Sequence, residues 1–487
     1  MPRRRAFTRW TKTTKSTSKL VAIFTVKRRD FLKGTFGAVG SLFCGELFAA
    51  PPDWKHDGEP NLVFGVISDT HLRTTVWGNR LGANWPDKYL VAALKYFKEQ
   101  NVDAVMHCGD MAHRGQVQEM AFHAGAWRKV FGKVTSGPVK LFVTGNHDVD
   151  GARYGSFVKN RYPDPEQYAS HVLETDMAAN WQRIWGEKYE PVWHKEVKGY
   201  HFFGRNWGVS EAEAIAALKN WKSGRDPLRP YFYIQHSRPS YGVRRELMRH
   251  VGAVSFFGHN HWSVTNWNII ALYRNRLPVI QCASCEPRGC GALVGDGWIT
   301  KAAIGGRDQT GRGRQGYVVR VYNDMLVIQR REFTAGAGAI LGSDWILPMN
   351  IFNPHPFVRS EMKKVIGEPQ FQSGAKLLIE SADVPTEEGK PAASVVKLTI
   401  PLANANPDSR VYAYEVAITS GEGSNTIYKA VYASGVNFGI GSEPNGGVTQ
   451  LTIPKAELPR NKTLSFTVRP LTSLGTSGKP ITAEYKE

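Results

Sequence analysis

The sequence predicts an α/β domain followed by a small all-β domain, and a change in pattern along the chain carries this prediction. From residue 61 to about residue 280, short apolar runs alternate with polar or glycine-containing breaks and helical stretches. Beyond residue 370, short alternating runs are separated by Gly, Asn, Pro and Ser, without helical periodicity. Alternating strands and helices are typical of sheets covered by helices, whereas strands alone indicate a sandwich. We therefore place the two domains at residues 51–369 and 370–487.

The α/β part is expected to begin with a buried strand over residues 61–67. The spacing of apolar residues over 87–99 predicts a helix. The segment 166–225 is rich in Trp and is expected to be more helical, an insertion that could shape a cleft. Further strands are expected at 102–107, 139–144, 231–235, 253–257, 316–322 and 325–329.

The carboxyl-terminal part contains about seven short alternating runs, which is the strand count of an immunoglobulin-like sandwich. Residues 464–475 also resemble the penultimate strand and turn of a fibronectin type III module. The expected strands are 375–380, 395–400, 411–418, 430–434, 450–453, 464–469 and 481–485.

Charge is spread unevenly along the 487 residues. The formal net charge is +19, and residues 1–50 supply +9 of it. The remaining surplus of +10 lies between residues 51 and 369, because eleven basic and eleven acidic residues balance from residue 370 onward. A basic surplus favours anionic partners, although a solvated basic surface is its commoner meaning, and nucleic acid is a possible but not a favoured partner.

The amino-terminal residues 1–50 are expected to be a basic leader and an export signal. Arg28 and Arg29 precede a weakly apolar, Gly-rich run over 34–50 and resemble a twin-arginine pair. That run is too short for a comfortable membrane span. We therefore expect the Tat export machinery as a partner, a periplasmic or cell-surface location, and no transmembrane domain in the mature protein.

Cysteine is rare, with five in the whole chain. Cys282, Cys285 and Cys290 lie close together in a Gly-rich loop. Three sulfurs make an incomplete structural zinc site, so a disulfide within this loop is the first expectation for an exported protein. Three separate thiols are the alternative.

Metal-binding residue types follow five of the predicted strands. Because strand carboxyl ends in open α/β sheets gather at one crevice, five loops can deliver these side chains to one place. His259 and His261 would face the same side if the backbone stayed extended between them. Gly109, Gly145 and Gly258 would leave room in a crowded cluster. The residues concerned are Asp69, His71, Asp110, Asn146, His236, His259 and His261.

These blocks, read in order as Asp-x-His, Gly-Asp, Gly-Asn-His-Asp, His and Gly-His-x-His, resemble the calcineurin-like metallophosphoesterase family. The resemblance runs from about residue 61 to the end of the α/β domain. It implies a four-layer α/β/β/α sandwich. It also implies two metal ions, for which carboxylates and imidazoles suit Fe, Mn or Zn.

The resemblance assigns each candidate ligand. Asp69, His71 and His261 would hold one ion, whereas Asn146, His236 and His259 would hold the second. Asp110 would bridge the two ions. Such a pair makes a bridging hydroxide available near neutral pH to attack a phosphate ester.

Three further residues are candidate catalytic residues. The resemblance makes His147 a general acid or hydrogen-bond donor, with Asp148 as its orienter; the alternative is a histidine that supports Asn146. Arg114 could make a forked contact to phosphate or face solvent. His113 stands where one family variant has an aspartate that supports the catalytic histidine.

The sequence therefore predicts an exported dinuclear-metal phosphoesterase that acts on an anionic mono- or diester. The alternative is a catalytically inactive protein that recruits polyanions or glycans through the basic face or the carboxyl-terminal sandwich.

Overall fold

The computed structural model describes residues 58–73, 87–153, 157–220, 229–249, 252–274, 276–285, 314–334, 338–349, 357–385, 392–404, 411–421, 424–441 and 443–486. These residues belong to one compact unit, Gly58–Glu487. The predicted export signal with Arg28 and Arg29, and Cys290, lie outside the described residues.

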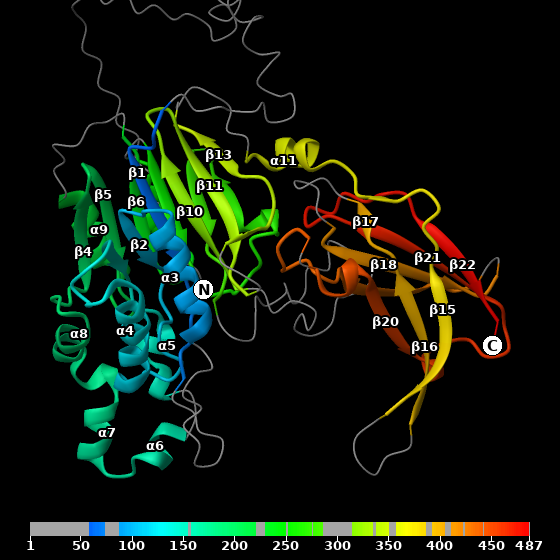
Figure 1. Ribbon diagram of the computed structural model, residues 1–487, viewed down its shortest axis with the longest axis horizontal. Helices are drawn as coiled ribbons and strands as arrows, with labels where there is room; N and C mark the ends of the chain where they lie inside the picture. The colour runs from blue at the N-terminus through cyan, green and yellow to red at the C-terminus, as the bar shows by residue number, and fades with distance from the viewer. Residues whose placement is uncertain are drawn as a thin grey trace, which may run out of the picture. The chain divides into compact units, whose positions relative to one another are not determined.

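The first sheet of the α/β region has seven strands in the order β12-β11-β10-β1-β2-β3, with β13 paired to β11 (Figure 1). The neighbours β1, β2 and β3 are parallel, whereas β10 joins β1 in the antiparallel sense. The strands are β1 (Leu62–Ile67), β2 (Ala104–His107), β3 (Val139–Phe142), β10 (Gln315–Val321), β11 (Met325–Glu332), β12 (Ala339–Ile340) and β13 (Trp345–Pro348).

The second sheet has six strands in the order β4-β5-β6-β7-β9-β8. Strands β5, β6, β7 and β9 run parallel to one another, and the edge strands β4 and β8 are antiparallel to β5 and β9. The strands are β4 (Val192–Val197), β5 (Tyr200–Arg205), β6 (Tyr231–Gln235), β7 (Ala253–Phe257), β8 (Ile270–Tyr273) and β9 (Leu277–Gln281).

The two sheets pack face to face. Phe64 of β1 lies 5.5 Å from Phe202 of β5 and 5.0 Å from Phe232 of β6, measured between ring centroids, and both pairs meet edge to face. Alternate residues of β1 therefore point to opposite layers, since Phe64 joins this central core while Val63 joins the core under the helices.

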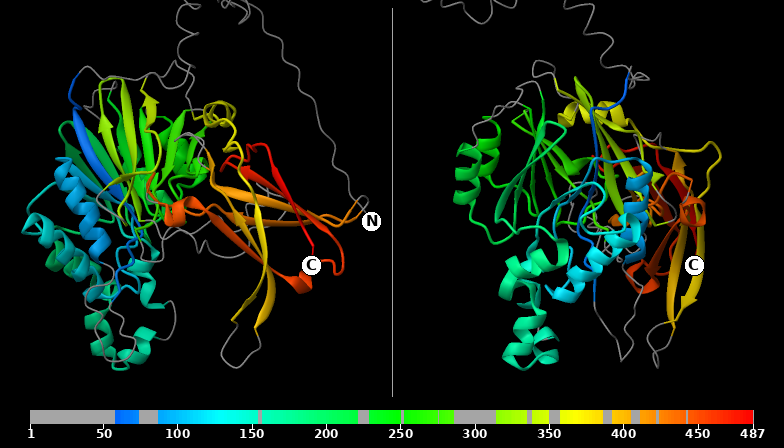
Figure 2. Two further views of the ribbon diagram at one scale, coloured as in Figure 1. Left: turned by 45° about the vertical axis from the view of Figure 1, so that its right-hand side comes forward. Right: turned by 60° about the vertical axis from the view of Figure 1, so that its left-hand side comes forward.

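Helices cover the outer face of each sheet. Helices α3 (Asp87–Glu99), α4 (Val117–Phe131) and α8 (Met177–Trp185) pack on the first sheet, and α9 (Glu211–Asn220) and α10 (Tyr241–Leu247) pack on the second. The result is the order helices, sheet, sheet, helices, as Figure 2 shows from two further sides. The remaining described α-helices are α5 (Asn146–Val149), α6 (Phe157–Arg161), α7 (Pro165–His171) and α11 (Arg359–Ile366).

The expectation of a mainly helical segment over 166–225 is wrong in its middle. Helices α7, α8 and α9 do form there, but β4 and β5 make an antiparallel hairpin between them. Strand β4 buries only Trp193 and Val197 fully, because it is an edge strand with polar residues on its other face. Its sequence therefore lacks the continuous apolar run that marks the buried strands.

The carboxyl-terminal region, residues 370–487, is rich in strands, and each of the seven predicted runs overlaps an observed strand. A three-stranded sheet has the order β15-β16-β20 and a four-stranded sheet the order β19-β18-β21-β22. Both sheets contribute to one apolar core. The strands are β14 (Gln370–Phe371), β15 (Leu378–Val384), β16 (Ala393–Ile400), β17 (Ala403–Asn404), β18 (Ala413–Thr419), β19 (Ile427–Tyr432), β20 (Thr449–Pro454), β21 (Leu464–Leu471) and β22 (Ile481–Tyr485).

Contacts join this β-rich region to the α/β region. Leu474 is fully buried and belongs to the same apolar core as residues of the two large sheets. The backbone N–H of Trp267 donates to Ser473 Oγ at 3.0 Å, and Gln315 Nε2 donates to the carbonyl of Asn437 at 2.9 Å.

Cys282 and Cys285 are buried thiols in the described part of the chain. The Cys285 Sγ lies 3.4 Å from the Gln315 carbonyl oxygen. The expected disulfide is therefore wrong for this pair, since both side chains take part in packing instead.

Among the described residues, no helix is both long and apolar enough to cross a membrane.

Candidate metal centre

The carboxyl ends of five parallel strands from both sheets deliver the predicted ligands to one place. Strands β1, β2 and β3 of the first sheet and β6 and β7 of the second all end beside it. The loops after them carry Asp69 and His71, Asp110, Asn146, His236, and His259 and His261. Every sequence-predicted ligand therefore belongs to one cluster.

The first group of donors consists of Asp69, His71 and His261, whose ligand atoms lie within 4.8 Å of one another. His261 Nε2 is 3.2 Å from Asp69 Oδ1 and 3.1 Å from His71 Nε2. Asp69 and His71 are buried, whereas the His261 side chain is 22% exposed.

The second group consists of Asp110, His236 and His259, joined by the Asn146 amide. His236 Nε2 lies 3.1 Å from Asp110 Oδ2, 3.0 Å from Asn146 Oδ1 and 3.1 Å from His259 Nδ1. Asn146 Oδ1 is also 3.1 Å from His259 Nδ1.

Hydrogen bonding fixes which atoms of the second group face inward. His236 Nδ1 lies 2.8 Å from the Cys108 carbonyl oxygen, so this nitrogen carries the proton and donates. In the neutral ring, Nε2 then presents a lone pair toward the Asn146 oxygen and the Asp110 carboxylate. Converging acceptors without enough donors fit a bound cation, and the N and O donor set suits a transition metal.

Asp110 lies between the two groups. Its Oδ2 is 3.5 Å from His71 Nε2 of the first group and 3.1 Å from His236 Nε2 of the second. Its Oδ1 accepts the backbone N–H of His147 at 2.8 Å. One carboxylate oxygen therefore faces both groups while the other is held by the backbone.

Electrostatics favours positive charge at this point. Burial opposes protonation of His236, but the carboxylates of Asp110 and Asp69 outweigh burial and raise the pKa of His236 to about 9. Burial likewise opposes ionisation of Asp69, yet His261 and His236 hold the pKa of Asp69 well below its usual range. The two buried carboxylates thus stabilise a cation between the rings.

The backbone is unusual at the same residues. Five candidate ligands have positive φ values, namely Asp69 (51°), His71 (43°), Asp110 (57°), His259 (78°) and His261 (57°). Among the described residues, only four other non-glycine positions share this conformation. Such conformations cost about 1–3 kcal/mol each and persist only where the surroundings enforce them.

The extended backbone expected between His259 and His261 is therefore wrong. Both residues adopt left-handed conformations, and their rings separate into different groups: His259 joins the second and His261 the first. The chain crosses from one group to the other within three residues. The assignment of these two histidines to different ions agrees with this geometry.

The expected crowding around three glycines is confirmed. A Cβ atom at Gly145 would overlap the Asp110 carboxylate, and one at Gly258 would overlap Ser68 and Asp69. Gly109 has φ 96° and packs against the His236 ring. Each glycine lets a backbone segment approach a candidate ligand closely.

The predicted catalytic histidine, His147, lies beside the first group. Its ring meets the His71 ring edge to face at 4.6 Å and stacks on the His113 ring at 5.3 Å. His147 Nδ1 donates to the His113 carbonyl oxygen at 2.7 Å, and this bond fixes the orientation of the ring. The orienter of His147 is thus a backbone carbonyl.

Asp148 has a different place from the one predicted. Its Oδ1 accepts the N–H of Ala112 at 2.7 Å, and its Oδ2 accepts that of Gly145 at 2.8 Å. Burial, and then the nearby Asp110 charge, raise the pKa of Asp148. Asp148 ties together the two loops that carry Asp110 and Asn146. Arg114 lies half-buried next to His113, and its contact to phosphate stays a prediction.

Sequence reasoning missed Trp207. Its indole lies 5.8 Å from the His236 ring and 6.1 Å from the His259 ring, nearly parallel to the latter. The indole Nε1 donates to Asp150 Oδ2 at 2.7 Å. Trp207 follows β5, whose carboxyl end meets the same edge, so recognition of β5 would have pointed to it.

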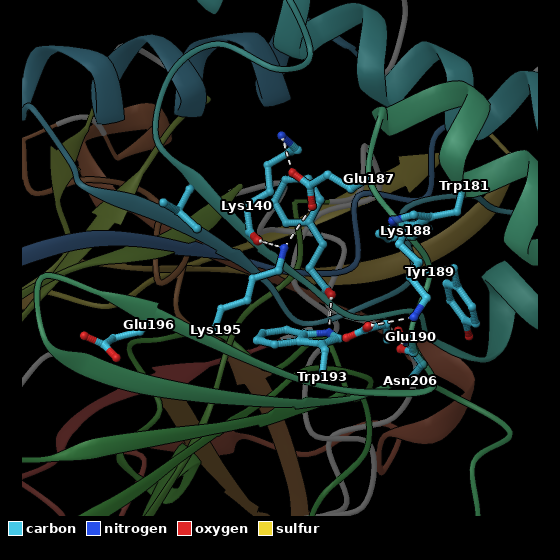
Figure 3. Close-up of a pocket in the computed structure, with 12 residues that line it drawn as sticks. Lys140, Trp181, Glu187, Lys188, Tyr189, Glu190, Trp193, Lys195, Glu196 and Asn206 are labelled. Carbon is cyan, nitrogen blue, oxygen red and sulfur yellow. Dashed lines mark hydrogen bonds and ion pairs between the residues drawn. The ribbon is translucent and has the colours of Figure 1, made fainter. Parts of the chain in front are cut away.

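A cavity of about 530 Å³ is lined by Trp181, Trp193, Lys140, Glu187 and Lys195 among others (Figure 3). Glu187 forms ion pairs with Lys140 at 2.7 Å and Lys195 at 2.8 Å. None of the candidate ligands lines this cavity, and Glu187 neutralises the charge of its buried Lys140. A smaller cavity of about 330 Å³ includes His236 and Trp207 and therefore reaches the cluster.

The part of the chain that carries the candidate ligands is similar to a known family. Residues 62–263 match the family model described as Calcineurin-like phosphoesterase. No curated protein sequence matches the chain.

Solved structures with a similar chain trace include a purple acid phosphatase from yellow lupin, with 11% identity, a TM-score of 0.38, and coverage of 59% of this chain and 55% of that chain. The 5'-nucleotidase of Candida albicans shows 14% identity and a TM-score of 0.31, with coverage of 57% and 53%. A predicted phosphoesterase of Streptococcus pneumoniae shows 12% identity and a TM-score of 0.27, with coverage of 59% and 97%. This chain thus spans about half the length of the lupin protein that it matches.

Proposed function

We propose that the chain is a metal-dependent hydrolase of phosphate esters, because residues 62–263 match the model of the calcineurin-like phosphoesterase family. The observation that carries the proposal is the position of Asp110 Oδ2, 3.5 Å from a histidine of one donor group and 3.1 Å from a histidine of the other. A shared carboxylate between two sets of imidazole and oxygen donors supports two neighbouring cation sites.

The donor groups divide the ligands between the two ions. Asp69, His71 and His261 would hold the first, and Asn146, His236 and His259 the second, with Asp110 shared. When bound, such a pair lowers the pKa of water and offsets negative charge on the phosphoryl group. Iron, manganese and zinc all suit these donors.

The chain's own residues prepare the reaction. The His113 carbonyl accepts from Nδ1 and fixes the His147 ring. In the protonated ring Nε2 carries the second N–H, which would donate a hydrogen bond or a proton to the leaving alcohol oxygen. Asp148 accepts from the peptide N–H groups of Ala112 and Gly145, which fixes the position of Asp110 relative to Asn146. Burial of the carboxylates keeps water away from their lone pairs and strengthens their hold on charge.

The experiment measures turnover and metal content together. Purified protein loaded separately with Mn, Fe or Zn is assayed on p-nitrophenyl phosphate and on bis(p-nitrophenyl) phosphate, and bound metal is counted by mass spectrometry. Two metals per chain and hydrolysis of at least one substrate are expected. The ratio of the two rates decides between monoester and diester preference.

A second candidate function is a polyanion- or glycan-binding protein without catalysis, which the net charge of +19 favours. Intact donors at all seven ligand positions speak against it. Protein that binds metal in the expected ratio but hydrolyses neither ester with any of the three metals would favour the binding protein and contradict the hydrolase.

We also propose that the chain is exported by a twin-arginine signal and acts in the periplasm or at the cell surface. The supporting observation is the pair Arg28 and Arg29 before an apolar, Gly-rich run. Replacing both arginines by lysine should abolish export of a fused reporter while leaving its synthesis unchanged. Export of the doubly substituted precursor at the normal rate would contradict this assignment.

For residues 370–487 we propose a fibronectin type III-like sandwich that serves as an accessory region. Its two sheets with a common core support this assignment.

A further inference from the structure

A cavity of about 330 Å³ lies beside the second donor group. It is lined by Arg205, Trp207, Gly208, Gln235, His236 and Ser237 among others. Arg205 ends β5 and is paired in register with Gln235, which ends the parallel strand β6. The cavity therefore opens at the same sheet edge as the donor groups, and His236 belongs to both.

Trp207 forms a fixed wall of this cavity. Its backbone N–H donates to Thr144 Oγ1 at 3.1 Å, and its indole Nε1 donates to Asp150 at 2.7 Å. Hydrogen bonds thus hold both the backbone and the indole of Trp207, and the ring lies beside His236 and His259. A rigid aromatic face next to the reacting centre suits the organic part of an ester, because it binds apolar surface at little entropic cost.

Arg205 supplies a positive charge that the neighbouring residues do not neutralise. Its Nε and Nη2 both donate to the Val209 carbonyl, at 3.1 and 2.5 Å, and its Nη1 donates to Gln235 Oε1 at 3.4 Å. Both acceptors are uncharged. Gln235 Oε1 also accepts the hydroxyl of Tyr233 at 2.9 Å. Among the described residues, no carboxylate forms an ion pair with Arg205, and the exposed Glu213 acts on it only at longer range.

The larger cavity of Figure 3 provides the contrast. There Glu187 lies 2.7 Å from Lys140 and 2.8 Å from Lys195, so the charges are satisfied within the protein. The Arg205 cavity keeps its charge available and reaches the donor groups, whereas the larger cavity does neither. A guanidinium with N–H groups to spare is suited to forked binding of a carboxylate or phosphate.

We propose that the Arg205 cavity binds a second anionic group of the substrate, on the organic part that leaves the scissile phosphate. The enzyme is then selective for phosphate esters that carry another carboxylate or phosphate. This inference rests on the proposed phosphoesterase function and names the substrate class of that site. Arg205 acts as a specificity residue, and Trp207 packs against the chain that joins the two anions.

The test compares matched pairs of substrates on the full-length, metal-loaded protein. Each pair consists of an alkyl phosphate and the ω-carboxyalkyl phosphate with the same number of carbons, from two to five, and released inorganic phosphate gives kcat/KM. The unchanged protein should prefer the carboxylate member at one length or more by about tenfold, the effect of one charge-assisted interaction. The preference should appear mainly in KM.

Arg205→Gln removes the charge but can still donate to the Val209 carbonyl, so the turn after β5 keeps a partner. This variant should lose the preference, and Arg205→Lys, which keeps the charge, should retain part of it. Lys188→Met is the matched control, because it removes an exposed charge at the larger cavity. It should keep the full preference.

The outcomes separate this inference from the function on which it rests. Turnover of neither member of any pair contradicts the proposed hydrolase itself. Turnover of both members with equal kcat/KM at every length overturns the second-anion site while leaving the hydrolase intact. A carboxylate preference that survives in Arg205→Gln overturns the role of Arg205. If Arg205→Gln does not fold, the difference between the unchanged protein and Arg205→Lys decides the same question.

Discussion

The α/β region and the carboxyl-terminal β-rich region are both built from sheets around an apolar core, yet they differ in how their strands end. In the α/β region, eight described non-glycine residues have positive φ values, and five of them are candidate ligands. In the β-rich region, Asn461 is the one described non-glycine residue of this kind. All fourteen histidines also precede residue 356. Left-handed backbone is therefore concentrated at the candidate metal centre, whereas the β-rich region is more regular.

Removal of one carboxylate from each region should affect the two regions very differently. Asp110→Asn should lower metal content and reduce turnover by more than about 10³-fold, since the change removes more than one preorganised electrostatic contact. Asp383→Ala, an exposed carboxylate in β15, should leave both quantities unchanged. Metal analysis and initial rates check this prediction, and an active Asp110→Asn protein with two metals would contradict the shared-carboxylate role.

A second variant separates metal binding from proton donation within the α/β region. His147→Ala should keep both metals but lower kcat by about 10²–10⁴-fold, the usual worth of a positioned acid or base. His171→Ala, in α7 and outside both donor groups, is the control and should have normal rates. Loss of metal from His147→Ala would instead make His147 a residue that supports Asn146.

Deletion of residues 370–487 tests how far the two regions are independent. We expect lower stability, because Leu474 is fully buried in the apolar core of the α/β region and loss of such a leucine side chain alone costs about 2–5 kcal/mol. The hydrogen bond from Trp267 N–H to Ser473 is lost as well. Thermal unfolding measures the effect, and a truncated protein with an unchanged midpoint and activity would show that the β-rich region is a separate appendage.

A smaller effect is predicted for His123, which should lower the stability of the protein in acid. His123 in α4 is fully buried, both of its ring nitrogens lack hydrogen-bond partners, and burial followed by the neighbouring His107 holds its pKa well below the usual 6.5. Below about pH 6.5, His123 binds a proton in the unfolded chain but not in the folded chain. The free energy of unfolding therefore decreases as pH falls below that value.

His123→Phe should reduce this loss, because phenylalanine fills a similar volume and does not titrate. Urea unfolding at pH 7.5 and pH 5.5 measures the difference in free energy of unfolding for the variant and for the unchanged protein. An equal loss between the two pH values in both proteins would assign acid sensitivity to other groups, of which buried His107, with its pKa lowered to about 3, is the nearest.

The strand ends could be predicted because each buried strand is a continuous apolar run that stops at a polar residue. The same reasoning failed for β4, where half of the residues face solvent. Missing β4 and β5 concealed Arg205 and Trp207, since a residue can be placed at the shared sheet edge only after its strand is recognised.

The left-handed backbone could not be predicted from the sequence either. It depends on contacts between loops, such as the bond from Asp69 N–H to the Gly109 carbonyl at 2.9 Å and that from His71 N–H to the Asp110 carbonyl at 3.0 Å. The role of Asp148 depends in the same way on peptide groups far from it in sequence. These are properties of the assembled loops, and no single segment carries them.

The positive φ values of Asp69, His71, Asp110, His259 and His261 also limit how the centre could be redesigned. Aspartate, asparagine and histidine tolerate left-handed backbone better than other side-chain-bearing residues. A protein engineer who exchanged these positions for cysteine or glutamate, in order to recruit a softer or larger ion, would work against the local conformation as well as the donor chemistry. The main-chain conformation therefore favours aspartate, asparagine and histidine at these positions, and such side chains suit hard and borderline ions.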